Sequence, residues 1–136
     1  LTEDRDTRKK KGEIGQGPVA ASTKLYGGAL VCFNATGYLV PGADTAGLSL
    51  AGVCKDHKDN SSGANGDLIA EFERDGLHLV NVNSAITQAN VGDDVCLVDD
   101  QTVDLAANTT NDIPAGKIIE FVASDKAYID IKPAIQ

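Results

Sequence analysis

Two pairs of adjacent acidic residues are the first candidates for chemistry in this 136-residue chain. Asp93 and Asp94 form one pair, and Asp99 and Asp100 form the other. Acid–base catalysis by carboxyl groups needs two of them facing one substrate with different pKa values. Neighbouring residues of a strand point to opposite faces, so neither pair forms such a dyad by itself. We interpret all four as surface acids of turns.

Other reactive groups also lack the spacing that their chemistry requires. Residues 56–67, DHKDNSSGANGD, combine acids and amides as calcium loops do, but they lack the alternating ligands and closing Glu of an EF-hand. His57 and His78 belong to no HxH or HExxH motif, and Cys54 has no evident base partner. No GxSxG motif is present, and the glycines of GADTAG precede no phosphate-binding lysine. We therefore expect no catalytic residue, no metal site and no cofactor.

The three cysteines are expected to be small core residues. Cys32, Cys54 and Cys96 are odd in number, far apart in sequence, and each lies in an apolar run. This pattern favours free thiols and folding in a reducing compartment. No apolar stretch approaches the roughly 18 residues of a membrane span, so a cytoplasmic protein without membrane contact is expected.

Charge is distributed unevenly along the chain. Lys and Arg total 12 and Asp and Glu total 20, for a net charge of −8. Residues 14–136 are strongly acidic and would repel a phosphate backbone, so direct nucleic-acid binding is not expected. Residues 1–17 combine dense charge, including Arg8, Lys9, Lys10 and Lys11, with three glycines. They have too little apolar area to order themselves, which predicts a flexible N-terminal arm.

Residues 18–136 are predicted to form one β-rich domain. Aromatic residues make up only 4% of the chain, and Trp and Met are absent, so the core must consist of Val, Ile, Leu and Ala. These residues favour strands. Short apolar runs separated by turn residues predict a mainly β fold, either a β-barrel or β-tulip-like domain or a sandwich. The runs are residues 19–24, 28–33, 38–41, 50–55, 67–74, 77–82, 94–98, 102–106, 117–123 and 126–132.

Turn residues suggest how these strands are connected. Residues 74–76, 99–102 and 124–126 have the composition of hairpin turns. Strict alternation in 126–132 predicts that Ala127, Ile129 and Ile131 share one buried face.

One short helix or helical turn is expected at residues 83–90. Asn83 or Ser84 could cap it, and Val91 and Gly92 would end it.

Two long loops of small or polar residues, 41–52 and 56–67, are expected to lie outside the core and to be flexible. Within the first, Pro41, Gly42 and Gly47 belong to a stretch that could approach another backbone closely. We interpret these three residues as a candidate capsid or inter-subunit contact. The alternative is an ordinary solvent-exposed turn.

Four segments in order carry a family resemblance: GGALVCFNATGYLVPGADTAGLSLAGVCKD, GANGDLIAEFERDGLHLVN, ITQANVGDDVCLVDDQTVDL and IPAGKIIEFVASDKAYIDIKP. Their succession resembles the capsid decoration, or head cement, proteins of tailed bacteriophages, over about residues 18–133. The order of the elements carries the resemblance, since no single element is diagnostic. The N-terminal RDTRKKKGEIGQG is more basic than that family leads one to expect.

The resemblance implies a compact β-barrel or β-tulip domain that binds the outer surface of the phage head and stiffens it. The implied partners are the major capsid protein and further copies of the chain, as a homotrimer or a dimer. The implied location is the outer capsid surface of the virion, after assembly in the host cytoplasm. No catalytic residues accompany the family.

The basic residues of the arm, Arg8, Lys9, Lys10 and Lys11, could pair with acidic capsid surface or lie over a neighbouring protomer, which would make binding salt-sensitive. Two alternatives remain open at this point. One is a carbohydrate- or host-surface-binding β module displayed on the virion, which would need exposed aromatic residues. The other is a small β-rich enzyme.

Overall fold

The computed structural model describes residues 2–6 and 12–133, and its regular structure there is almost entirely strand. This confirms the predicted mainly β class. The strands are β1 (Ile14–Pro18), β2 (Thr23–Leu25), β3 (Leu30–Phe33), β4 (Leu39–Pro41), β5 (Ser49–Cys54), β6 (Lys58–Asn60), β7 (Ile69–Glu73), β8 (Leu77–Val82), β9 (Asp94–Leu97), β10 (Thr102–Leu105), β11 (Pro114–Ala123) and β12 (Lys126–Ile131). Two 3-10 turns, η1 (Gln88–Asn90) and η2 (Ala106–Asn108), complete the described elements.

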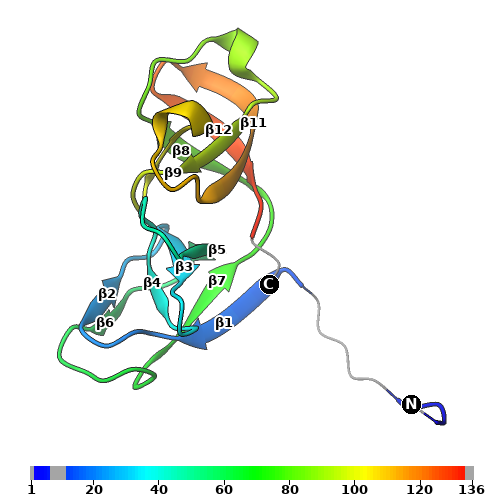
Figure 1. Ribbon diagram of the computed structural model, residues 1–136, viewed down its shortest axis with the longest axis vertical. Helices are drawn as coiled ribbons and strands as arrows, with labels where there is room; N and C mark the ends of the chain where they lie inside the picture. The colour runs from blue at the N-terminus through cyan, green and yellow to red at the C-terminus, as the bar shows by residue number, and fades with distance from the viewer. Residues whose placement is uncertain (1, 7–11, 134–136) are drawn as a thin grey trace.

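The C-terminal strands form a closed barrel, seen at the top of Figure 1, in the order β10-β8-β12-β11-β9. Because the barrel is closed, every strand has a neighbour on both sides. No further strand is needed to pair with the backbone N–H and C=O groups of an edge. β8 and β10 pair in parallel, whereas the other neighbours in the barrel are antiparallel. The choice between barrel and sandwich is thereby decided for this half of the chain.

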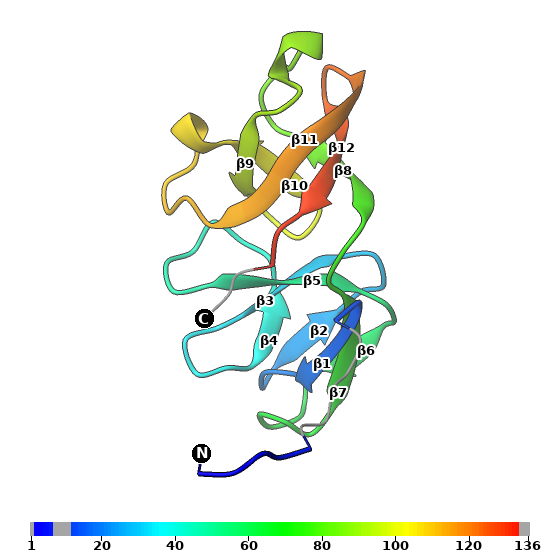
Figure 2. The same cartoon turned by 90° about the vertical axis from the view of Figure 1, so that its right-hand side faces the viewer.

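The N-terminal strands form a five-stranded sheet in the order β1-β7-β5-β3-β4, below the barrel in Figure 2. β1 and β4 are the two edge strands of this sheet. Val19, just after β1, forms an isolated bridge with Leu39 of β4, so the sheet curls until its edges meet. The amide of Ala20 also donates to the carbonyl oxygen of Leu39, at 3.0 Å. A separate two-stranded ribbon of β2 and β6 lies beside the sheet.

One aliphatic core joins the sheet to the barrel. The larger buried cluster contains Leu30 and Leu50 from the sheet together with Leu97, Ile118 and Ile129 from the barrel. A second, smaller cluster lies within the sheet half. Because both halves bury side chains in the same cluster, they share one continuous core.

The alternation predicted for β12 is confirmed. Ala127 and Ile129 are fully buried, and Ile131 is 4% exposed. Both of the later hairpins are confirmed as well. Residues 99–102 connect the paired strands β9 and β10, and residues 124–126 connect β11 and β12.

The hairpin predicted at residues 74–76 is wrong. These residues lead from β7 of the sheet to β8 of the barrel, and the two strands do not pair. β7 already lies between β1 and β5, while β8 lies between β10 and β12. Turn residues set a change of direction, but the choice of neighbour depends on which strands share a core.

The predicted boundary of the N-terminal arm is also wrong at its C-terminal side. Residues 14–17 belong to β1, which pairs in antiparallel register with β7 from Ile14↔Glu73 to Pro18↔Ile69. Backbone hydrogen bonds to β7 order this glycine-rich stretch, which has few apolar side chains to bury. Arg8, Lys9, Lys10 and Lys11 lie outside the described residues.

The helical turn expected at residues 83–90 is present as η1, but its cap differs from the prediction. Thr87, not Asn83 or Ser84, accepts the amide of Ala89, and the Asn90 side chain accepts the amide of Thr87. The hydroxyl of Ser84 instead donates to the buried carboxylate of Asp104 in the barrel.

Candidate functional site

The loop predicted to touch another molecule makes its closest approach within its own chain. Gly42 is buried, and a Cβ there would lie 3.1 Å from the carbonyl oxygen of Leu30 and 3.4 Å from that of Asp99. Gly42 is therefore not available to another backbone, which corrects the prediction for this residue. Pro41 ends β4 opposite Val31. Gly47 is exposed, with a φ of 87° that favours glycine, and it stays a predicted contact.

The same loop connects the sheet to the barrel through Asp44. Its carboxylate accepts the amides of Thr110 and Asn111, each at 2.8 Å. The Asn111 side chain donates to the carbonyl oxygen of Asp44. The backbone amide of Asp44 donates to the carbonyl oxygen of Val98. Residues 41–52 were expected to be a flexible loop outside the core, and this prediction is wrong. These bonds hold the part around Asp44 against the barrel, and residues 49–52 belong to β5, where Leu50 and Ala51 are buried in the core.

The two amide donors lower the pKa of Asp44 below its ordinary value of 3.8. A depressed pKa means that the link stabilises the fold above the ordinary Asp pKa and weakens as pH falls through the lower value. We expect the amide proton shifts of Thr110 and Asn111, followed by NMR from pH 6 downward, to change with a midpoint below that of an exposed Asp. Asp44→Asn should abolish this titration. A midpoint at the ordinary Asp value would contradict the assignment.

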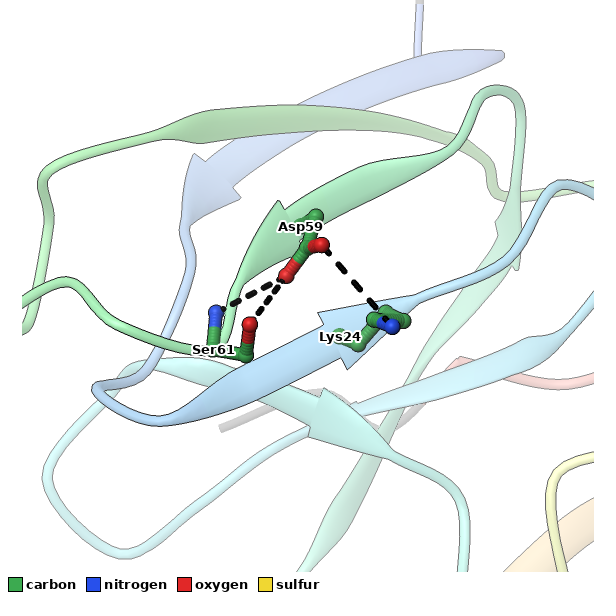
Figure 3. Close-up of polar contacts among 3 residues, drawn as sticks. All are labelled: Lys24, Asp59 and Ser61. Atoms are coloured by element: carbon green, nitrogen blue, oxygen red, sulfur yellow. Dashed lines mark hydrogen bonds and ion pairs between the residues drawn. The ribbon is translucent and has the colours of Figure 1, made fainter.

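The second predicted loop, residues 56–67, is likewise more ordered than expected. It contains β6, and the side-chain amide of Asn60, 3% exposed, donates to the carbonyl oxygens of Ala20 and Ala64. Asp59 accepts the hydroxyl and the amide of Ser61 and lies 3.8 Å from Lys24 Nζ (Figure 3). The Ser61 hydrogen bonds, with a smaller contribution from Lys24, lower the pKa of Asp59. These contacts close the turn after β6 and tie it to β2.

The candidate catalytic acids serve mostly in local structure. Asp93 accepts the side-chain amide of Asn90, and Asp94 pairs with Lys117 at 3.0 Å. Asp99 accepts the amide of Gln101 two residues on, as turn acids do. Within residues 2–6 and 12–133, no three His, Cys, Asp or Glu side chains are grouped so that they could hold a metal ion.

All three cysteines are free and buried, as predicted. Burial raises the pKa of Cys32 to about 12, and it also raises the pKa values of Cys54 and Cys96. The Cys54 thiol donates to the carbonyl oxygen of Asp56 at 3.1 Å. A thiol must lose its proton to act as a nucleophile, so burial disfavours the reactive thiolate form of all three residues.

The barrel carries exposed apolar side chains on the outer wall formed by β8, β12 and β11, which lie side by side in Figure 2. Leu79 of β8 lies opposite Tyr128 of β12, which in turn lies opposite Glu120 of β11. Leu77 and Leu79 are each 50% exposed, whereas Val80, the next residue of β8, is buried in the core cluster. We call Leu77, Leu79, Ile119, Val122 and Tyr128 the barrel face.

Two β-bulges in β11 add to the barrel face. The pairing with β12 shifts between Ile118 and Glu120 and again between Phe121 and Ala123, so Ile119 and Val122 have no partner. Both side chains point outward and are 42% and 46% exposed. A β-bulge changes the direction in which the side chains of its strand point. The length difference between β11, with ten residues, and β12, with six, appears only in the structure, because the apolar runs 117–123 and 126–132 are equally long.

Charged residues of both signs lie within and beside the barrel face: Glu120 is opposite Tyr128, and Asp130 is opposite Leu77. Lys117, Lys126, Glu120 and Asp130 all belong to β11 or β12. Exposed apolar side chains with polar groups among them are common on protein interaction surfaces. The barrel face is therefore the candidate functional surface for protein binding.

A scan of protein-family models and searches of curated proteins and solved structures find no match to this chain. In the part of the chain that the structure describes, no helix has the length and apolar character needed to cross a membrane.

Proposed function

We propose that this protein is a phage-head decoration protein that binds the outer surface of the major capsid protein lattice and has a structural, non-enzymatic role. The observation that carries the proposal is the barrel face, a set of exposed apolar side chains on one wall of a closed barrel. The proposal also rests on the order of sequence segments that resembles decoration proteins.

A rigid binding surface suits this role. The wall of the barrel is hydrogen-bonded on both sides of every strand, so the barrel face has little conformational entropy to lose on docking. Burial of Leu77, Leu79, Ile119 and Val122 would supply apolar contact, and the charged residues among and beside them would set orientation.

Self-association belongs to the same proposal. A homotrimer, or a dimer, would present several barrel faces to a symmetric lattice at once. Weak individual contacts then combine into stable occupancy, because each later contact forms at high effective concentration.

Leu79→Glu tests the proposal. The variant places a charge in the barrel face beside Tyr128. We expect the apparent Kd for purified heads lacking the protein to rise at least about tenfold, which corresponds to about 1.4 kcal/mol. Co-sedimentation with the heads gives the occupancy, and image reconstruction gives the position of the bound density.

Ile69→Glu is the matched control, since Ile69 is 55% exposed but belongs to β7 of the sheet. It should leave occupancy unchanged. Equal binding by wild type and Leu79→Glu would reject the barrel face as the docking surface. Failure of the wild-type protein to bind heads at all would reject the proposed function.

A further inference from the structure

A pocket of about 360 Å³ lies where the sheet meets the barrel. It is lined by Tyr26, Gly27, Gly28, Ala29, Asp100 and Gln101. Its volume falls in the range of small-molecule sites. We propose that this pocket binds a neutral saccharide.

Backbone hydrogen bonds hold the two sides of the pocket together. The turn after β2 is closed by the amide of Ala29, which donates to the carbonyl oxygen of Tyr26 at 3.1 Å. The amide of Leu30 donates to the carbonyl oxygen of Asp100 at 2.7 Å, which fixes the β9–β10 turn against this first turn. The pocket is therefore preformed, as sites between packed units of a fold often are.

Tyr26 provides an aromatic surface at the pocket. It is 54% exposed, although tyrosine usually buries most of its ring. The ring of His57 contacts it edge-on, with 5.2 Å between ring centroids and an interplanar angle of 61°. This contact restricts the Tyr26 ring. The electron-rich face of an aromatic ring attracts C–H groups polarised by neighbouring oxygens, which a sugar ring presents in a row.

Three polar side-chain groups of the pocket are available to bind a ligand. In the described parts of the chain, the side chains of Asp100 and Gln101 and the hydroxyl of Tyr26 have no protein hydrogen-bond partner. Together they offer a carboxylate acceptor, an amide that both donates and accepts, and a phenol that does the same. Gly27 and Gly28 add no side chains, so a ligand can reach the backbone.

This combination of groups distinguishes a saccharide from other ligands. Sugar hydroxyls donate and accept, so they satisfy all three protein groups, whereas a cationic side chain would leave the Gln101 and Tyr26 donors unused. An anionic sugar would be repelled by Asp100 and by Asp99 beside it. A neutral saccharide is the class that uses every group present.

The test is an NMR titration of the ¹⁵N-labelled full chain with four neutral probes at millimolar concentration: maltotriose, mannotriose, galactotriose and chitotriose. We expect at least one probe to shift the amide signals of Gly27, Gly28 and Gln101. Tyr26→Ala should weaken that response at least about tenfold, whereas Tyr26→Phe, which keeps the ring, should weaken it only about threefold. Tyr128→Ala, on the barrel face, is the control and should leave the response unchanged.

Absence of a response to all four probes would overturn the proposal, as would a response that persists in Tyr26→Ala. A stronger response to N-acetyl-lysine amide than to any sugar would assign the pocket to a cation instead. The barrel face is intact in Tyr26→Ala, so this variant should occupy phage heads normally. Sugar binding and head binding can therefore fail independently.

Discussion

Replacement of Leu30 by alanine is expected to lower the free energy of unfolding of the whole chain by about 3 kcal/mol, within the range of about 2–5 kcal/mol measured for such core truncations. Leu30 is 1% exposed and lies in the cluster that contains both sheet and barrel residues. The cavity left by the lost side chain would remove contacts from both halves. We expect them to unfold together in one transition.

Urea denaturation followed by NMR measures this effect, because amide signals of β3 and β11 report on the sheet and on the barrel separately. Leu77→Ala is the control, since Leu77 is 50% exposed on the barrel wall and its truncation should cost below about 1 kcal/mol. Separate midpoints for β3 and β11, in wild type or variant, would show that the two halves do not share one cooperative core.

Replacement of Asp104 by alanine is the second change with a large expected effect. Asp104 is 1% exposed, in the barrel strand β10. Its carboxylate accepts the amide of Leu105 at 2.8 Å, and both the amide and the hydroxyl of Ser84, at 3.3 and 3.0 Å. Alanine would leave two backbone amides without an acceptor, at about 1–3 kcal/mol each, so we expect a loss of about 3 kcal/mol.

Asp104→Asn separates hydrogen bonding from side-chain volume. Asparagine has nearly the same size and keeps one acceptor oxygen, so its expected loss is only about 1 kcal/mol. Urea denaturation of both variants gives the comparison. Similar losses for alanine and asparagine would mean that the hydrogen bonds to Ser84 and Leu105 are not what stabilises this part of the barrel.

Much of the fold could be predicted from local sequence. Each of the ten apolar runs overlaps a strand, although run 19–24 shares only Thr23 and Lys24 with β2, and the turns at 99–102 and 124–126 connect paired strands. β1 and β6 were missed, because their stretches are polar or rich in glycine and carry no hydrophobic period. Each is held by pairing with a strand distant in sequence: β1 with β7, and β6 with β2.

The candidate surfaces were harder to predict. Alternation assigns each strand residue to one face, so a bulge that turns Ile119 or Val122 outward breaks the rule on which the prediction depends. Tyr26 could be identified as an aromatic residue next to two glycines. Its neighbours in the pocket, Asp100 and Gln101, come from a turn more than seventy residues away.

The sequence alone determined the class of structure, because an aliphatic composition, period-two alternation and turn residues are local properties that set which segments become strands. Only the tertiary structure decided which strands became neighbours, since pairing depends on contacts between segments far apart in the chain. The same contacts turned Gly42 and Asp44 inward, toward the chain's own backbone. They also brought the barrel face and the Tyr26 pocket to the surface as separate sites.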